Sequence, residues 1–210
     1  MKKRARWVLL KIGMLALTVM LLKLTGLCFC EQSAYASHFR YGHVSWQPGS
    51  AATNEIEFTV DGAFRRDGYS GSGVDGFPVV NDVITEYVGG TRLQFGDGVE
   101  TSTLQFKVTS YDETNNWIFG RALDPNDSSK TTISHSYPSA GTYTAMNASC
   151  CRISDVDGVN EHINNPDGSW NVETIIIVGT GNSSPVSAMP PIVQCAQNGL
   201  CTFTVPGSDA

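Results

Sequence analysis

Two stretches decide the fold of this 210-residue chain: Phe95-Gly96-Asp97-Gly98 and His135-Ser136-Tyr137-Pro138-Ser139-Ala140-Gly141-Thr142-Tyr143. The first predicts a strand that ends in a tight turn, because glycine adopts positive φ without steric cost and Asp-Gly between apolar runs favours a hairpin. The second predicts a strand, a turn and a returning strand. Both stretches therefore indicate antiparallel β-structure.

The spacing of Gly141, Tyr143 and Ala145 matches the tyrosine corner of immunoglobulin-like sandwiches, and Ala145 stands where antibody domains carry cysteine. Together the two stretches resemble the PKD (polycystic kidney disease) domain, a β-sandwich of extracellular multidomain proteins. The resemblance covers about residues 88–179, although Leu93-Gln94 stand where that family usually has Trp-Asp. It implies an all-β, antiparallel immunoglobulin-like β-sandwich. The structural motif that it implies consists of Phe95, Gly96, Asp97, Gly98, His135, Tyr137, Gly141 and Tyr143.

The rest of the chain also has the pattern of short strands separated by turns. Residues 54–64 alternate apolar and polar side chains, which predicts a strand with one buried face, and Gln47-Pro48-Gly49-Ser50 predicts a hairpin with residues 38–46. Residues 67–76, with four glycines, predict a loop, and residues 79–88 fit either strand or loop. Further strands are expected at residues 103–108, 117–123, 131–137, 142–151 and 170–178.

The expected domain organisation has four parts. Residues 1–36 form a signal peptide, residues 37–179 the PKD-like sandwich and residues 180–191 a linker rich in Gly, Ser and Pro. Residues 192–210 resemble the opening of a cadherin-like or bacterial immunoglobulin-like repeat, which implies a truncated second β-domain. Residues 37–80 lie outside the usual extent of the PKD family, so they form either an added sheet edge or the part that carries specificity.

The first 36 residues have the pattern of a secretory signal. Four basic residues precede an apolar stretch, and Ala34-Tyr35-Ala36 supplies a small-x-small cleavage pattern. A retained membrane anchor is the alternative, but Lys11 and Lys23 leave only residues 12–22 uncharged, which is shorter than the ~20 residues that span a bilayer. We therefore expect a secreted or cell-surface protein that meets the membrane only through its cleaved signal peptide.

Charge argues against nucleic acid as a partner. Residues 37–210 carry 8 Lys or Arg and 19 Asp or Glu, a net charge of −11, and nucleic-acid binding needs a basic surface. The acidity fits a soluble secreted surface, or one that meets divalent cations or basic partners. The isolated Arg40, Arg65 and Arg66 are expected to pair with surface carboxylates.

Four cysteines follow the signal peptide, and an exported chain favours disulfides. Cys195 and Cys201 enclose a short loop containing Asn-Gly, which favours a tight turn, so we expect this pair to be bonded. Cys150 and Cys151 are adjacent on a strand and point to opposite faces, so a bond between them would be strained. One of them can be a buried thiol.

An acidic loop offers the best candidate metal site. Asp155, Asp157, Asn160 and Glu161 surround a turn-forming glycine, and alternating oxygen ligands are what calcium requires. The spacing is not that of an EF-hand. The favoured interpretation is a solvated acidic loop, and weak calcium binding is the alternative; no other cofactor is expected.

The sequence carries no recognisable catalytic motif. It lacks a Gly-x-Ser-x-Gly elbow, a His-Glu-x-x-His pair and a phosphate-binding glycine loop. His38 and His43 fall on opposite faces of one strand, so a shared metal is not expected. Asp97 and His135 are expected to make structural hydrogen bonds. Trp46, Trp117 and Trp170 are expected in the core, unless two of them prove coplanar and exposed, which would favour carbohydrate binding.

We therefore predict a non-enzymatic secreted or cell-surface binding or adhesion module that contacts an extracellular protein or carbohydrate. The alternative is an accessory domain of a secreted polysaccharide- or protein-degrading enzyme. Three Asn-x-Ser sequences, at Asn126, Asn147 and Asn182, would be glycosylation acceptors only in a eukaryotic host.

Overall fold

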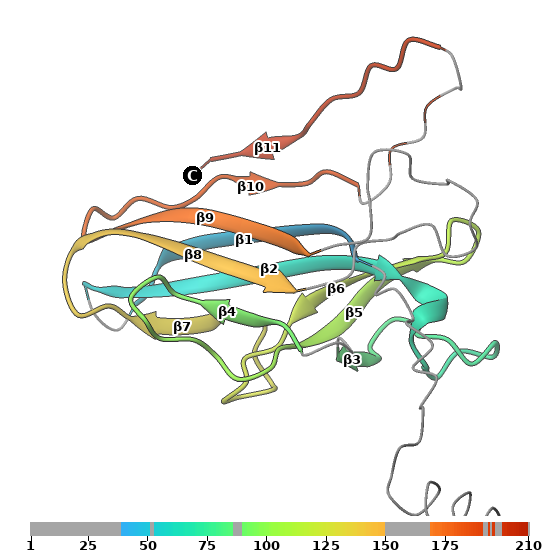
Figure 1. The fold of residues 1–210 in the computed structure, drawn as a ribbon, viewed down its shortest axis with the longest axis horizontal. Helices are drawn as coiled ribbons and strands as arrows, with labels where there is room; N and C mark the ends of the chain where they lie inside the picture. The colour runs from blue at the N-terminus through green and yellow to red at the C-terminus, as the bar shows by residue number, and fades with distance from the viewer. Residues whose placement is uncertain are drawn as a thin grey trace, which may run out of the picture. The chain divides into compact units, whose positions relative to one another are not determined.

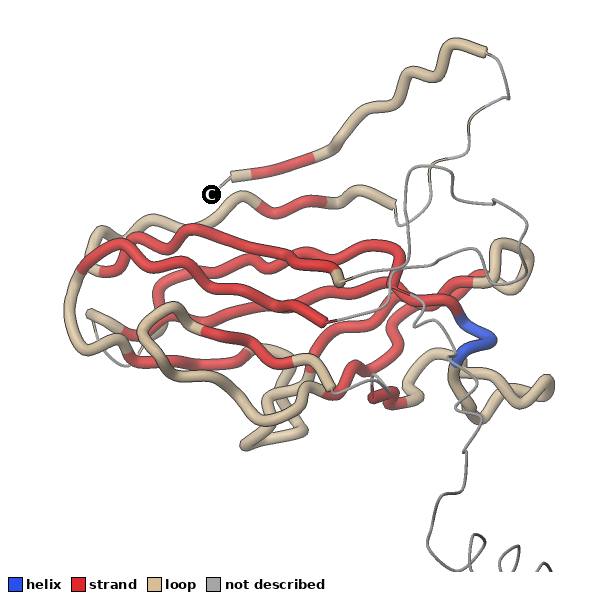
Figure 2. The backbone as a smooth tube through the Cα atoms, in the orientation of Figure 1, coloured by secondary structure: helices blue, strands red, loops and turns tan. Residues whose placement is uncertain are grey.

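The computed structural model describes residues 39–50, 53–85, 90–149, 169–190, 193, 195 and 199–209. The chain divides into two compact units, Met1–Tyr35 and Ala36–Ala210, and all the described residues belong to the second. Among its described residues the regular secondary structure consists of β-strands, apart from one short 3₁₀ turn, η1 (Arg66–Gly68) (Figures 1 and 2). No helix among the described residues is long and hydrophobic enough to cross a bilayer.

Two antiparallel sheets pack face to face, which confirms the prediction of an all-β sandwich (Figure 1). The larger sheet has the order β1-β2-β6-β5-β3, and β7 pairs with the beginning of β2. Its strands are β1 (Phe39–Pro48), β2 (Glu55–Arg65), β3 (Val83–Thr85), β5 (Gln105–Asp112), β6 (Trp117–Ala122) and β7 (Ile133–Ser136). The smaller sheet, β4-β8-β9, consists of β4 (Arg92–Gln94), β8 (Gly141–Ser149) and β9 (Trp170–Val178).

The core lies between the sheets and follows the alternation of the sequence. On β2, Ile56, Phe58 and Val60 point inward and are almost completely buried, whereas the intervening polar residues are half-exposed. Burial of side chains of this size stabilises a fold by roughly 1.5–3 kcal/mol each. The inward positions of the facing sheet supply Leu93, Phe95, Ala145, Ile176 and Val178.

The N-terminal part of the sandwich is more than an added sheet edge. β2 pairs with β1 along one side and with both β6 and β7 along the other, so it is a central strand of the larger sheet (Figure 1). β1 lies at the edge. A sandwich built from residues 88–179 alone would therefore lack β2, a central strand of the larger sheet.

Part of the expected linker lies along the open edge of β1. The backbone N–H of Ser184 donates to the Trp46 carbonyl (2.9 Å), and the Trp46 N–H donates to Ser184 Oγ (2.8 Å). Three residues later, the Ser187 N–H donates to Nε2 of His43 (3.3 Å). These contacts occupy backbone groups that an edge strand would otherwise leave unpaired.

The C-terminal residues form a small ribbon. β10 (Val186–Ser187) pairs antiparallel with β11 (Gly207–Ser208). Between them Cys195 and Cys201 are joined by a disulfide, with their Cα atoms 5.5 Å apart.

Candidate functional site

The residues of the predicted structural motif meet where the Asp-Gly turn after β4 reaches β7. Nε2 of His135 lies 2.8 Å from Oδ2 of Asp97, and the Val99 N–H donates to Oδ1 of the same carboxylate (3.0 Å). The imidazole ring stacks on Phe95, with ring centroids 3.9 Å apart. The Asp97 carboxylate therefore stabilises its own turn through Val99 and connects this turn to β7 of the larger sheet through His135.

Two tyrosines complete this cluster. The Tyr137 hydroxyl donates to the Phe95 carbonyl (2.9 Å), and burial, followed by the nearby charge of Asp97, raises the pKa of Tyr137, which keeps this donor protonated. The Tyr143 hydroxyl donates to the carbonyl of Ser139 (3.2 Å), four residues upstream. This return of a tyrosine hydroxyl to the preceding backbone is the geometry of a tyrosine corner.

The arrangement is suited to holding the two sheets together rather than to catalysis. The side chains of His135 and Asp97 are 12% and 7% exposed. The imidazole of His135 stacks on Phe95 and packs edge-on against Tyr137, with 4.7 Å between the ring centroids, so packing and the bond to Asp97 hold it in place. We interpret the cluster as a structural clasp between β4, β7 and β8.

The clasp predicts an acid-dependent loss of stability. Burial alone would raise the pKa of Asp97, but hydrogen bonds from His135 and from the Val99 N–H, together with the charge of His135, bring it below its ordinary value. A carboxyl whose pKa is lower in the folded state stabilises the fold above its unfolded pKa of about 3.9, and this contribution is lost as the pH falls through the folded pKa. We expect Asp97→Asn to be less stable at pH 7 by about 1–2 kcal/mol and to lose less stability in acid.

Urea unfolding of both proteins between pH 2 and pH 7 measures this difference. Asp124→Asn provides a control, because the Asp124 side chain accepts the N–H of Asn126 in the turn between β6 and β7, whereas His135 is bonded to Asp97. Parallel stability curves for the wild type and Asp97→Asn below pH 4 would show that the Asp97–His135 pair is not linked to folding.

Trp46 and Trp170 do not form the exposed platform that carbohydrate binding would use. Trp46 and Trp170 are 4% and 3% exposed. Nε1 of Trp46 donates to the Ile175 carbonyl (2.9 Å), and Trp170 stacks on Phe39 with 3.8 Å between ring centroids. Trp117 is half-buried on β6. The first two are therefore packing residues, as expected.

The proposed calcium residues Asp155, Asp157, Asn160 and Glu161 lie outside the described residues, as do Cys150 and Cys151. Calcium binding there stays a prediction. Within the part of the chain that the structure describes, no group of three His, Cys, Asp or Glu side chains is placed to hold a metal ion.

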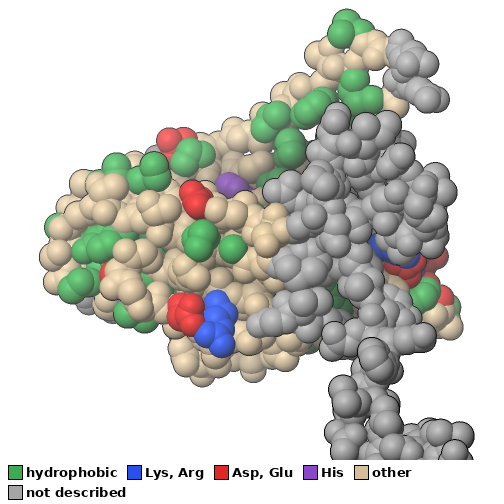
Figure 3. All heavy atoms as spheres, in the orientation of Figure 1, with side chains coloured by type: hydrophobic (Ala, Val, Ile, Leu, Met, Phe, Trp, Pro, Cys, Tyr) green, Lys and Arg blue, Asp and Glu red, His purple; other side chains and the backbone are tan. Residues whose placement is uncertain are grey.

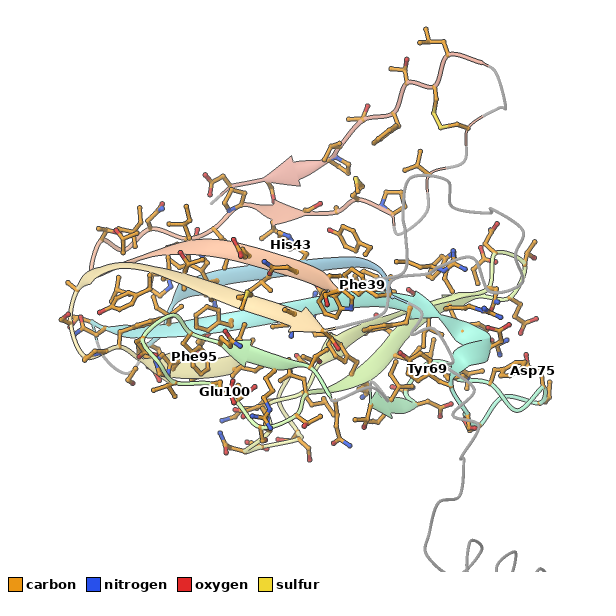
Figure 4. All side chains as sticks on the ribbon, viewed as in Figure 1. Phe39, His43, Tyr69, Asp75, Phe95 and Glu100 are labelled. Carbon is orange, nitrogen blue, oxygen red and sulfur yellow. A yellow bond between two sulfur atoms is a disulfide. The ribbon has the colours of Figure 1, made fainter. Side chains whose placement is uncertain are left out.

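A loop held by a buried arginine is the feature that the sequence did not reveal. The guanidinium of Arg66, 4% exposed, donates from Nε to the Pro78 carbonyl (2.8 Å) and from both terminal nitrogens to the Asp75 carboxylate (2.5 and 2.9 Å). It also lies over the rings of Tyr111 and Phe77, 4.9 and 5.7 Å from their centroids. Arg66 thereby fixes residues 70–82, which we call the Val74 loop. Figure 4 labels Asp75 at this end of the sandwich.

Hydrogen bonds within the Val74 loop also stabilise it. The Gly71 N–H donates to the Gly76 carbonyl (2.9 Å), and the Gly73 N–H donates to the Phe77 carbonyl (3.0 Å). At its far end, the Asp82 carboxylate accepts hydrogen bonds from the N–H and hydroxyl of Ser72, and these lower the pKa of Asp82. Side-chain and backbone bonds together hold this glycine-rich segment in one conformation.

An apolar side chain stands at the tip of this braced loop. Val74 is fully exposed, and it is flanked by Gly73 and by Asp75, whose pKa the hydrogen bond from Arg66 lowers. Loops on rigid scaffolds are common sites of recognition. The glycine content of residues 67–76 was sufficient to predict a loop, but the pairing of Arg66 with Asp75 and its burial depend on packing that no local pattern encodes.

The outer face of β9 carries the other exposed apolar residues of interest. Ile175 and Ile177 are 64% and 40% exposed, and Figure 3 shows hydrophobic side chains over the surface where β8 and β9 lie. Nearby, Arg92 and Glu100 form an exposed ion pair. Single exposed apolar residues are ordinary on protein surfaces, so exposure alone does not distinguish this face from Val74; Val74 differs because it stands on a loop that Arg66 fixes.

Comparison with known proteins extends over most of the chain. The family model described as "Integrin beta-like protein A-E, N-terminal" matches residues 40–179. Integrin beta-like protein C of Dictyostelium discoideum is 38% identical over 183 residues, which cover 83% of this chain and 8% of that protein. Integrin beta-like protein E of the same organism is 36% identical, covering 73% of this chain and 7% of that protein. The chain thus spans less than a tenth of the length of these relatives, and no solved structure matches it.

Proposed function

We propose that this chain, which belongs to the integrin beta-like protein A-E N-terminal family, is a non-enzymatic adhesion-type module that binds another protein at the cell exterior. The relatives' names support adhesion over the alternative of an accessory domain in a degradative enzyme. Secretion or surface display through the signal pattern of residues 1–36 is part of the same proposal, as is the finer likeness to PKD domains.

The observation that carries the proposal is the exposed Val74 on a loop fixed by Arg66. A loop that is already ordered loses little conformational entropy when it binds, so more of the contact energy appears as affinity. Val74 supplies apolar area and Asp75 supplies a partly exposed carboxylate beside it. Val74 and Asp75 lie within residues 37–80, which favours the expectation that this segment carries specificity.

A protein partner fits these features better than a carbohydrate. Sugar sites generally use exposed aromatic faces, whereas Trp46 and Trp170 are buried here. An exposed valine beside a carboxylate instead suits a shallow apolar pocket with a basic rim. The net charge of −11 in residues 37–210 also favours a basic partner surface.

Replacing Val74 by aspartate is expected to lower adhesion about tenfold or more, because burying a valine contributes roughly 1.5–3 kcal/mol and 1.4 kcal/mol corresponds to a factor of ten. The secreted chain is coupled to beads, and its attachment to cells of the species of origin is measured against bead density. Attachment that disappears after mild protease treatment of the cells identifies a protein partner.

Ile177→Thr is the matched control, since it removes an exposed apolar side chain from β9 and leaves the Val74 loop unchanged. Both substitutions should leave the melting temperature within a degree or two, because both positions are on the surface. Equal attachment by Val74→Asp and wild-type beads would exclude the loop as the contact site.

A further inference from the structure

The three Asn-x-Ser sequences are placed very differently by the fold. Each has the pattern of an N-glycosylation acceptor, Asn126-Asp127-Ser128, Asn147-Ala148-Ser149 and Asn182-Ser183-Ser184. The relatives come from a eukaryote, in which exported chains with this pattern meet the glycosylation machinery. The sequence alone treats the three positions as equivalent, whereas their surroundings in the structure separate them.

Asn147 is incompatible with a carbohydrate in the folded chain. It lies on β8 with 3% of its surface exposed, and its Nδ2 donates to the Arg92 carbonyl of β4 (3.0 Å). An oligosaccharide on Nδ2 would replace that hydrogen bond and would have to fit inside a packed sandwich, where even a few extra atoms are costly. A chain modified at Asn147 could not form the β4–β8 pairing.

Asn126, unlike Asn147, lies on the surface of the folded chain. Its side chain is exposed in the turn between β6 and β7, and Ser128 is exposed with it. Asp124 fixes the turn, since its side-chain Oδ1 accepts the Asn126 N–H (2.8 Å) and its backbone carbonyl accepts the Asp127 N–H (3.1 Å). The Asn126 side chain is not part of these bonds, so a glycan there would leave the turn intact.

Asn182 is also exposed, in the connection between β9 and β10. Its sequence partner Ser184 becomes buried only when the chain folds and its hydroxyl accepts the Trp46 N–H. Because sugar transfer acts on the chain as it enters the secretory pathway, that hydroxyl is available at the moment it is needed. After folding, the Asn182 side chain still faces solvent.

We propose that the folded protein carries N-linked oligosaccharides at Asn126 and Asn182 and none at Asn147, because a chain that received a sugar at Asn147 before folding could not form the β4–β8 pairing. In the transfer, Nδ2 of asparagine forms a bond to C1 of the first sugar of a lipid-pyrophosphate-linked oligosaccharide. The C1–O bond breaks, the electron pair leaves with the lipid pyrophosphate, and one amide proton passes to base. The inference rests on the export that the proposed function includes.

The two acceptors leave the proposed contact loop uncovered. The β9–β10 connection lies at the end of the sandwich opposite η1, and the β6–β7 connection lies along its lower border in Figure 1. The Val74 loop follows η1 directly and is at the other end. Carbohydrate at these two positions would confine protein contacts to the loop end and to the sheet faces.

The test is site mapping on the full 210-residue chain expressed in Dictyostelium discoideum cells, recovered from cells and medium together and purified in its folded, monodisperse form. Enzymatic deglycosylation in H₂¹⁸O converts each glycosylated asparagine to ¹⁸O-labelled aspartate, which mass spectrometry assigns to a position. We expect label at positions 126 and 182 and unlabelled Asn147. Asn126→Gln and Asn182→Gln should each increase electrophoretic mobility by one step, and Ser128→Ala should reproduce the first of these shifts while keeping Asn126.

Label at Asn147, or its absence from Asn126 or Asn182, would overturn the inference. A chain retained in the cytosol carries no label at any position and overturns it as well. Because bead attachment is measured separately with Val74→Asp, a glycosylated chain that does not adhere would refute the proposed function alone, and an adhesive chain without glycans would refute this inference alone.

Discussion

Arg66→Met is expected to free the Val74 loop, to reduce adhesion at least as much as Val74→Asp, and to lower the free energy of unfolding by about 2 kcal/mol. Arg66 is 4% exposed, and its Nε is hydrogen-bonded to the Pro78 carbonyl. Leaving a buried acceptor without its donor costs about 1–3 kcal/mol. Methionine retains much of the apolar volume against Phe77 and Tyr111, so the loss reports on the guanidinium rather than on a cavity.

Two measurements separate loop release from global unfolding. Limited proteolysis at 25 °C should cut Arg66→Met within residues 70–79 while the rest of the sandwich stays intact, since a loop that opens locally is cleaved without full unfolding. Chemical denaturation gives the change in stability. Arg65→Met is the matched control: Arg65 is about a third exposed and bonded to the exposed Asp67, so its loss should change stability by less than about 0.5 kcal/mol.

An Arg66→Met protein that resists protease as well as the wild type would contradict the anchoring role. The same substitution also tests the proposed function, because a protein that keeps its fold but loses both loop order and adhesion connects the two properties. Arg66 itself is hardly exposed, so lost adhesion would reflect loop position rather than a direct contact.

The largest effect on stability is expected from Gly96→Ala. Gly96 has φ of +86°, and an added Cβ would lie 2.9 Å from the backbone N of Thr144 on β8 and closer still to its carbonyl oxygen. Positive φ costs an ordinary residue about 1–2 kcal/mol, and overpacking against fixed backbone adds about 1–3 kcal/mol. The total, about 3 kcal/mol, should lower the melting temperature by roughly 6–12 °C.

Gly98→Ala supplies the control within the same turn. Gly98 has φ of +93° but nothing within 4 Å of an added Cβ, so only the backbone strain remains. Its cost should be about 1–2 kcal/mol. Differential scanning calorimetry of the two variants therefore separates the strain of the turn from the close approach of β4 to β8. Equal melting temperatures would mean that the turn moves away from β8 at little cost.

The sequence predicted the strands well because the fold uses local signals at those positions. The alternation in residues 54–64 became β2, and the Asp-Gly turn after Phe95 was found where two glycines take positive φ. The four consecutive apolar residues Ile175-Ile176-Ile177-Val178 form the end of β9, where Ile176 and Val178 are buried and the other two are exposed. In each case the information needed lay within a few residues.

What the sequence could not predict are contacts between distant segments. The pairing of β2 with β7 joins residues about eighty positions apart in the chain, and the bond from Ser184 to Trp46 spans 138 positions. Arg66 was expected to pair with a surface carboxylate. It does pair with Asp75, but it is buried and lies over the rings of Phe77 and Tyr111, which come from different parts of the chain.

The contacts along the edge of β1 have a mechanical consequence for the adhesion-type module that we propose. Ser184 faces Trp46 and Ser187 faces His43, so the two segments run in opposite directions, and Phe39 and Pro190 leave from the same end. Tension applied between these two points would load the His43 contact first and the Trp46 contacts afterwards, one after another. Hydrogen bonds that are loaded one after another break at a lower force than bonds that share the load. Under tension, residues 184–187 would therefore separate from the edge of β1 before the strands of the sandwich slide past one another.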